Sequence, residues 1–208
     1  MKHTLKNTAK LSGLALAAVA AFTAFGTGAA QAATFTKASI TIAPRTSEAK
    51  ETTAGDLNCS FTETGLGPYA QVSYECKAAA VGVVEACVYK NKIISATQLS
   101  TFTNVSNVEG GHEAQVFLAK ANGTVSGSVI TAIPEAEGGG GGEEAELCPE
   151  LGEVNGPEPA VEVVAVRWCN ASLTDTTNNI VGTTVGELFQ EFFPGATVPS
   201  CAVLLGTP

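Results

Sequence analysis

Residues 59–76 read CSFTETGLGPYAQVSYEC, in which two alternating stretches flank a Gly-Leu-Gly-Pro turn signal. Strand side chains return to the same face every two residues, so a hairpin centred between Gly67 and Pro68 predicts three pairs on one face. These pairs are Cys59 with Cys76, Phe61 with Tyr74, and Glu63 with Val72. The pattern predicts a core-facing stripe. It leaves open whether the two cysteines bond each other, because directly opposed positions can strain a disulfide.

Other segments of the chain have the composition of strands. Thr34–Ile42 alternates in part between apolar and polar residues, which predicts a first strand. Ala79–Tyr89 and Ala160–Asn170 are apolar on both faces, as expected for the central strands of a sandwich. The Thr- and Ser-rich stretch Ile93–Ser106 is interpreted as a further strand.

The dipeptide Asn122-Gly123 predicts a second hairpin. Asn-Gly readily supplies the two positive-φ positions of a type I′ turn, the turn that best fits a two-residue hairpin loop. With the turn centred there, Val116 lies opposite Val129, and one face of the hairpin is more apolar than the other. This is the pattern of a sheet with one solvent-exposed side.

The C-terminal part contains one helix signal. Thr184–Glu187 matches a capping box ahead of an apolar stretch that reaches Phe193, which predicts a short helix that Pro194 ends. Ala202–Leu205 is interpreted as a last strand. Together these elements predict a mainly β protein: a disulfide-stapled antiparallel β-sandwich with one short C-terminal helix.

The N-terminal residues have the pattern of a secretory signal peptide. Three lysines precede the apolar run Leu11–Phe25, and Ala30-Gln31-Ala32 is an A-x-A cleavage pattern. We therefore expect residues 1–32 to be removed on export. Residues 33–208 would then form a single secreted β-rich domain, located outside the cell, on its surface or in a periplasm.

Charge and composition narrow the choice of partners. The predicted leader carries three lysines and no acidic residue, so its removal changes the formal charge from −9 to −12. Such an acidic protein is not expected to bind nucleic acid or anionic lipid. Residues 135–150 hold five consecutive glycines among glutamates, which predicts an acidic, Gly-rich surface loop. Beyond the leader, no apolar run reaches the length of a membrane helix, so we expect no membrane attachment after cleavage.

Six cysteines in an exported chain predict three disulfides. Three precede the five glycines of residues 138–142 and three follow them, so full pairing requires at least one bridge between the two halves. The favoured alternatives are Cys59–Cys76 or Cys76–Cys87 on the N-terminal side, with Cys169 bonded to Cys148 or Cys201. The candidate disulfide residues are Cys59, Cys76, Cys87, Cys148, Cys169 and Cys201.

Few residues have the pattern of a catalytic or metal site. His112 is the one histidine beyond the leader, and no G-x-S-x-G nucleophile motif is present. Paired glutamates could serve a hydrolase, but those on predicted strands are expected on a solvent-exposed sheet face. These strand glutamates are Glu63, Glu75, Glu85 and Glu162. The acidic loop lacks the Asp-rich pattern of a calcium loop, and we expect no cofactor and no specific metal.

Four Asn-x-Ser/Thr patterns match the N-glycosylation acceptor, a match that is relevant only in a host that glycosylates. They begin at Asn58, Asn104, Asn122 and Asn170. The leading hypothesis is a non-enzymatic extracellular protein that acts through its surface in adhesion, structure or binding. Its partner would be an extracellular protein, a glycan surface or further copies of itself. The alternatives are a secreted carbohydrate-active or other hydrolase that uses paired glutamates, and an extracellular metal-binding protein.

Overall fold

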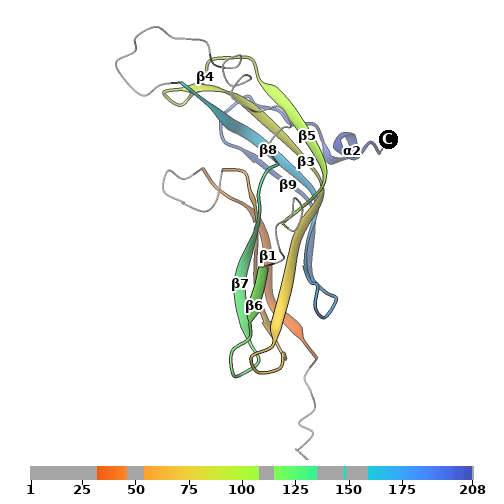
Figure 1. The fold of residues 1–208 in the computed structure, drawn as a ribbon. Coiled ribbons are helices and arrows are strands. Elements are labelled where there is room, and N and C mark those ends of the chain that lie inside the picture. The colour runs from red at the N-terminus through yellow and green to blue at the C-terminus, as the bar shows by residue number, and fades with distance from the viewer. Residues whose placement is uncertain (1–31, 46–53, 108–114, 135–147, 149–158, 208) are drawn as a thin grey trace, which may run out of the picture. The chain divides into compact units, whose positions relative to one another are not determined.

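The computed structural model describes residues 32–45, 54–107, 115–134, 148 and 159–207 (Figure 1). Several sequence expectations therefore lie outside the described residues. They are the signal peptide, His112, and the acidic Gly-rich loop except for Cys148. Among the described residues, no helix has the length and apolar character needed to cross a bilayer.

The smaller of two antiparallel sheets has the strand order β1-β2-β7 within the described residues. Its strands are β1 (Thr34–Ile42), β2 (Leu57–Thr64) and β7 (Val125–Thr131). The predicted bounds of the first strand are confirmed. β2 alternates between buried and half-buried residues along its whole length, which is typical of a strand with one face in a core.

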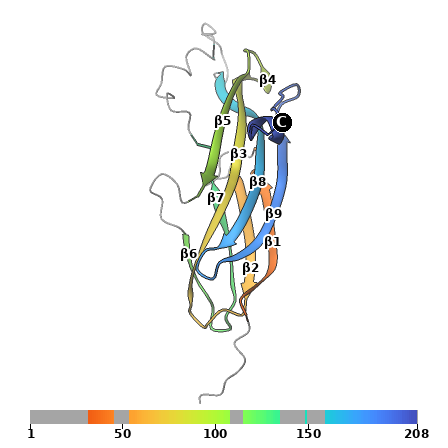
Figure 2. The ribbon, with the colours of Figure 1, turned by 90° about the vertical axis from the view of Figure 1, so that its right-hand side faces the viewer.

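The larger sheet is built around β3 (Gln71–Tyr89), which pairs with β8 (Ala160–Asp175) along most of its length. β9 (Ile180–Glu191) flanks β8, and three shorter strands follow one another along the other edge of β3 (Figures 1 and 2). These short strands are β4 (Lys92–Ile93), β5 (Gln98–Ser106) and β6 (Gln115–Leu118). The two predicted central strands are therefore confirmed, and they pair with each other.

The predicted hairpin over residues 59–76 is wrong in its backbone pairing, but two of its three predicted side-chain pairs are in contact. β2 and β3 lie in different sheets, and the connection between them crosses from one sheet to the other. Cys59 is nevertheless bonded to Cys76, and the rings of Phe61 and Tyr74 stack with centroids 3.9 Å apart. An apolar stripe can be buried by a facing sheet as well as by a neighbouring strand, and here the facing sheet buries it.

The predicted hairpin at Asn122-Gly123 is wrong for the same reason. β6 pairs with β3 in the large sheet, whereas β7 pairs with β2 in the small one. Gly123 has a positive φ of 70° and Asn122 is not among the positive-φ residues, so the turn is not type I′. The side chain of Asn122 instead accepts a hydrogen bond of 3.1 Å from the N–H of Thr124.

The helix predicted from Thr184 to Phe193 is wrong, and a short helix lies further along the chain instead. Residues 184–191 lie within strand β9, paired with β8, and the helix α2 is Cys201–Leu204, where the last strand was expected. The β-branched run Thr183-Thr184-Val185 favours a strand, and the neighbouring β8 provides its hydrogen-bond partner. This tertiary pairing outweighs a local capping signal.

All six cysteines are paired, as Cys59–Cys76, Cys87–Cys148 and Cys169–Cys201. The first bond joins the two sheets. The second connects the halves of the chain before and after the five glycines of residues 138–142, as the odd number of cysteines in each half requires. The third fixes the segment around α2 to β8.

In the large sheet, the alternation of core-facing and outward-facing side chains is interrupted about halfway along each of the long strands β3, β5, β8 and β9. Core-facing residues normally lie two apart in a strand, but the residues of one core cluster are three apart at one level of four strands. These pairs are Ala78 and Val81, Phe102 and Val105, Trp168 and Ala171, and Val185 and Leu188. Two residues lie between the members of each pair, and one of the two falls at a gap in the strand pairing. These four residues form a row across the sheet, which we call the kink row: Asn104, Ala79, Asn170 and Gly186.

Two hydrophobic clusters lie on opposite faces of the large sheet. One fills the space between the two sheets and contains the fully buried Trp168, whose Nε1 donates to the carbonyl oxygen of Gly55 at 2.8 Å. The other lies beyond the kink row on the opposite face, where Val84 and its neighbours are covered by the C-terminal segment, residues 192–205. Gly82 allows this close cover, because a Cβ there would lie 2.8 Å from Val198.

Candidate functional site

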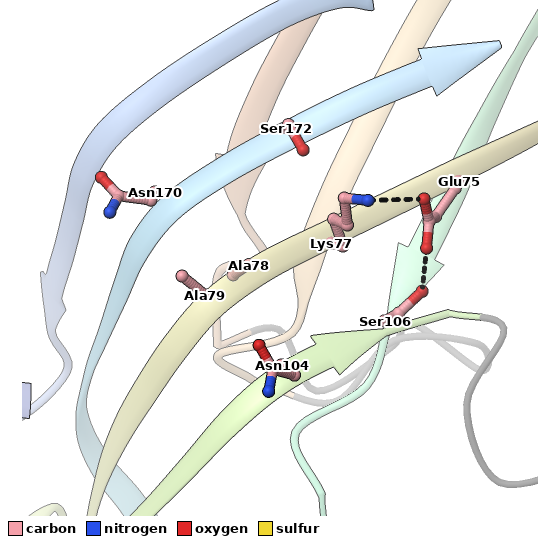
Figure 3. Close-up of a pocket in the computed structure, with 8 residues that line it drawn as sticks. All are labelled: Glu75, Lys77, Ala78, Ala79, Asn104, Ser106, Asn170 and Ser172. Atoms are coloured by element: carbon pink, nitrogen blue, oxygen red, sulfur yellow. Dashed lines mark hydrogen bonds and ion pairs between the residues drawn. The ribbon is translucent and has the colours of Figure 1, made fainter. Parts of the chain in front are cut away.

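An open pocket lies over the kink row, on the face of the large sheet that points away from the small sheet (Figure 3). Its volume is about 350 Å³, within the range of small-molecule sites. Strands β3, β5 and β8 supply its walls, and the alanines of β3 form its apolar part. The lining residues are Glu75, Lys77, Ala78, Ala79, Asn104, Ser106, Asn170 and Ser172.

Three of the polar side chains form one connected group. The ammonium of Lys77 contacts Glu75 Oε2 at 3.0 Å, and the hydroxyl of Ser106 donates to Glu75 Oε1 at 3.1 Å (Figure 3). The side chain of Glu75 is 19% exposed and that of Lys77 is 51% exposed. The carboxylate is thus held within the wall of the pocket, whereas the ammonium stays accessible to a ligand.

Asn104 and Asn170 have positive φ values of 54° and 51°, although both lie in strands. Asparagine adopts this left-handed conformation more readily than most residues. Both side chains are exposed, and they lie on the two strands that flank Ala79. The backbone reversal of the kink row therefore brings two amide side chains to the same pocket.

Two of the four glycosylation patterns meet at this pocket, because Ser106 and Ser172 follow Asn104 and Asn170 by two residues. The other two have different surroundings. Asn58 lies in β2, where its Oδ1 accepts a hydrogen bond from Ser60, and Asn122 belongs to the connection between β6 and β7.

The balance of groups in the pocket determines what it can bind. One carboxylate and one ammonium cancel in charge, and hydroxyl and amide groups supply both hydrogen-bond donors and acceptors. This set suits a neutral ligand with many hydroxyl groups. A strongly charged ligand would have to separate the Glu75–Lys77 ion pair.

A second polar group lies inside the protein. Glu63, Tyr74 and Asp175 are fully buried, and the Tyr74 hydroxyl donates to Glu63 Oε2 at 2.7 Å. Burial raises the pKa of Glu63 from 4.5 to about 7, with a further increase from the nearby Asp175 and an opposing decrease from the Tyr74 hydrogen bond. The prediction that Glu63 faces solvent is therefore wrong. The hydrogen bond from Tyr74 and the contact with Asp175 give the buried carboxyl group of Glu63 polar partners inside the core.

The remaining strand glutamates are half-buried. Glu162 forms an ion pair of 2.7 Å with Arg45, and Glu85 lies on β3 beyond the kink row. Within the described ranges, no group of three or more His, Cys, Asp or Glu side chains is placed to hold a metal ion.

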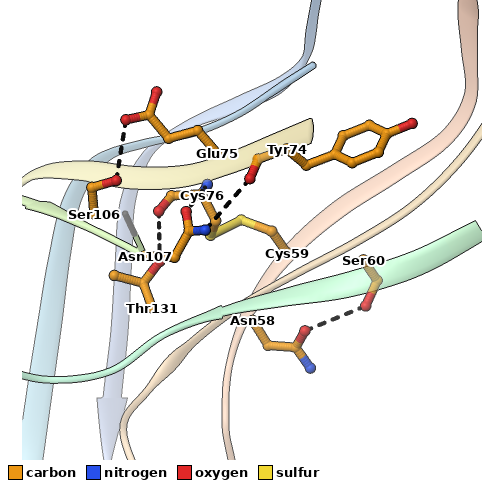
Figure 4. The surroundings of a disulfide bond; sticks show 9 residues. All are labelled: Asn58, Cys59, Ser60, Tyr74, Glu75, Cys76, Ser106, Asn107 and Thr131. Carbon is orange, nitrogen blue, oxygen red and sulfur yellow. Dashed lines mark hydrogen bonds between the residues drawn. A yellow bond between two sulfur atoms is a disulfide. The ribbon is translucent and has the colours of Figure 1, made fainter. Parts of the chain in front are cut away.

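The Cys59–Cys76 disulfide is a structural bond of the core. Both cysteines are fully buried, and the backbone of Cys76 is held on both sides (Figure 4). Its N–H donates to Asn107 Oδ1 at 2.6 Å, and its carbonyl oxygen accepts from the Thr131 hydroxyl at 2.5 Å. Such enclosure shields the sulfur atoms from exchange with external thiols.

The sequence did not predict the pocket. A signal for it does exist, namely the three-residue spacing of core-facing positions combined with asparagine at the break in two strands. Comparison with known proteins adds no functional information, because neither a protein-family model nor a curated protein matches the sequence.

Proposed function

We propose that this protein is a secreted, non-enzymatic binding module that holds a neutral glycan of an extracellular surface in the pocket over the kink row. The observation that carries the proposal is the lining of that pocket. It combines a self-neutralised Glu75–Lys77 ion pair with hydroxyl and amide groups on an exposed sheet face.

The charge of the whole chain supports a neutral ligand. With a formal charge of −9 before removal of the predicted leader, the protein repels polyanions such as acidic polysaccharides. The ammonium of Lys77 and the amides of Asn104 and Asn170 supply donors for sugar hydroxyls, and Glu75 supplies acceptor oxygens. Ala79, which is half-buried between them, offers an apolar contact for the ring of a sugar.

The hydrolase alternative has less support from the geometry. A glycosidase needs two carboxyl groups about 5–10 Å apart that both reach the substrate. The pocket lining contains one carboxylate, Glu75, whereas the adjacent pair Glu63 and Asp175 is fully buried between the sheets. The metal-binding and self-assembly alternatives stay predictions. Elemental analysis and size-exclusion chromatography of the purified protein test them.

The test is a binding assay of the secreted protein on an array of neutral and acidic oligosaccharides, followed by calorimetric titration of any ligand found. In the pocket variant, Lys77→Ala and Ser172→Ala are combined. A matched control combines Lys37→Ala and Ser39→Ala, which lie exposed on β1 of the small sheet. We expect the pocket variant to bind at least tenfold more weakly and the control to bind like the wild type.

Two outcomes would contradict the proposal. One is that no neutral oligosaccharide binds, and the other is that the pocket variant retains wild-type affinity. Release of new reducing ends during incubation with an oligosaccharide would favour the hydrolase alternative instead.

A further inference from the structure

Glu63 and Asp175 are fully buried carboxyl groups that belong to different sheets. Glu63 is on β2 of the small sheet, and Asp175 is the last residue of β8 in the large sheet. Tyr74, on β3 of the large sheet, donates its hydroxyl to Glu63 at 2.7 Å. The interface between the sheets therefore contains a polar contact inside an otherwise apolar cluster.

The hydrogen bonds around Asp175 suit an ionised carboxylate. Its Oδ1 accepts from the backbone N–H groups of Thr177 at 2.8 Å and Asn178 at 2.9 Å, and its Oδ2 accepts from the Asn178 amide at 2.6 Å. All three are donors from the turn between β8 and β9. An ionised carboxylate accepts such bonds without losing any of them.

The surroundings of Glu63 favour its protonated form. Its Oε2 accepts from Tyr74, but its Oε1 is buried without a donor among the described residues. The neighbouring Asp175 also presents acceptor oxygens, so a hydrogen bond between the two carboxyl groups forms only when one of them is protonated. A proton on Glu63 satisfies this requirement and avoids two adjacent negative charges in the core.

We propose that Glu63 and Asp175 share one proton across the sheet interface, and that the loss of this proton at rising pH weakens the contact between the sheets. The device is independent of the proposed glycan pocket. The Cys59–Cys76 bond keeps the sheets linked, so deprotonation loosens the interface rather than separating it.

The groups packed around Glu63 are consistent with this role. Its register partners in the small sheet, Phe35 on β1 and Val125 on β7, are apolar. Among the described residues, the titratable groups that act on Glu63 are Tyr74 and Asp175. Burial, followed by the Glu63 hydrogen bond, raises the pKa of Tyr74 well above its ordinary value, so Tyr74 stays a neutral donor throughout the relevant range.

The sign of the pH effect follows from the pKa of Glu63. Burial raises this pKa from 4.5 to about 7 in the folded protein. Between these pH values the unfolded chain releases the proton and the folded protein keeps it, so stability falls as pH rises. Above about pH 7 both states are ionised, and this contribution stays constant.

The test is equilibrium unfolding of the full secreted chain, disulfides intact, at pH values from 4.5 to 8.5. The variant is Glu63→Gln, and the matched control is Glu191→Gln at the exposed end of β9. We expect the unfolding equilibrium constant of the wild type, relative to Glu63→Gln, to rise by up to about tenfold per pH unit between 5 and 7. The control should follow the wild type. His112 is present in the wild type and in every variant, so any contribution of its imidazole to the pH dependence cancels.

A second measurement remains informative if Glu63→Gln fails to fold. In wild-type protein with ¹³C-labelled glutamate, one side-chain carboxyl resonance, that of Glu63, should titrate near pH 7. Hydrogen exchange of peptides that cover 57–64 and 171–176, corrected for intrinsic rates, should increase over the same pH range. Parallel profiles for wild type and Glu63→Gln, or the absence of any glutamate that titrates above about pH 6, would overturn the proposal.

Discussion

The backbone N–H of Leu66 donates a hydrogen bond of 3.1 Å to the carbonyl oxygen of Gly123. This bond links the two connections that cross between the sheets, one from β2 to β3 and the other from β6 to β7. A second bond of 2.8 Å, from the N–H of Ala119 to the carbonyl oxygen of Ala70, reinforces the link. The two crossings therefore form one unit at the same end of the sandwich.

Replacement of Gly123 by alanine should destabilise this unit. A Cβ at Gly123 would lie 2.1 Å from the backbone oxygen of Leu66, and its φ of +70° is unfavourable for alanine. We expect a loss of at least about 2 kcal/mol in the free energy of unfolding, measured by urea denaturation. Gly186→Ala is the matched control, because nothing lies within 4 Å of its new Cβ, and it should change stability by less than about 1 kcal/mol.

The left-handed conformation of Asn170 predicts a specific order of substitutions. A β-branched residue is unfavourable at φ +51°, so Asn170→Val should cost about 1–3 kcal/mol of unfolding free energy. Asn170→Gly should cost less, since glycine adopts this conformation without steric conflict. Denaturation of both variants checks the order, and equal losses would show that the kink row does not depend on backbone conformation at this position.

The Cys169–Cys201 bond should act mainly on the C-terminal segment. Removing it through a Cys169→Ala and Cys201→Ala double variant should cost about 3–4 kcal/mol for a loop of 32 residues. Residues 192–205 cover the apolar cluster around Val84, so their release should make them the first site of protease cleavage. Limited proteolysis with mass spectrometry measures this. Cleavage that starts elsewhere at the same rate in wild type and variant would contradict it.

Tyr74→Phe should move the pH dependence of the unfolding free energy that arises from Glu63 to higher pH. The Tyr74 hydrogen bond lowers the pKa of Glu63, so its removal raises that pKa above about 7. The fall in stability that begins near pH 4.5 should then continue to a higher pH than in the wild type. The lost hydrogen bond should also cost about 1 kcal/mol at all pH values. Unfolding profiles from pH 4.5 to 9 test both effects, and an unshifted profile would argue against the contact.

The sequence predicted which side chains share a face better than which strands share a sheet. Alternation placed Cys59, Phe61 and Glu63 together with Cys76 and Tyr74, and these residues do meet. The same alternation is compatible with a hairpin and with two facing sheets, because both bury one stripe. Local sequence contains no information on which β-strand provides the backbone partner.

The candidate pocket and the buried acid depend on contacts between distant parts of the chain. Asparagine favours turns over strands, but its presence alone does not show that the backbone of Asn104 and Asn170 is left-handed within a continuing strand. Glu63 resembles a surface residue until Asp175 and Tyr74 are placed beside it. The central parts of β3 and β8, in contrast, could be predicted, because a strand that is buried on both faces has an uninterrupted run of apolar residues in its sequence.

The kink row also constrains how this protein can change during evolution. Each long strand of the large sheet crosses the row at a single residue, and that residue sets which side chains face the core in the next half of the strand. Deletion of Ala79 alone would exchange the side chains of the second half of β3 between the two hydrophobic clusters on opposite faces of the sheet. Insertions and deletions should therefore be tolerated in the connections between strands, whereas the four positions of the row must keep their spacing together.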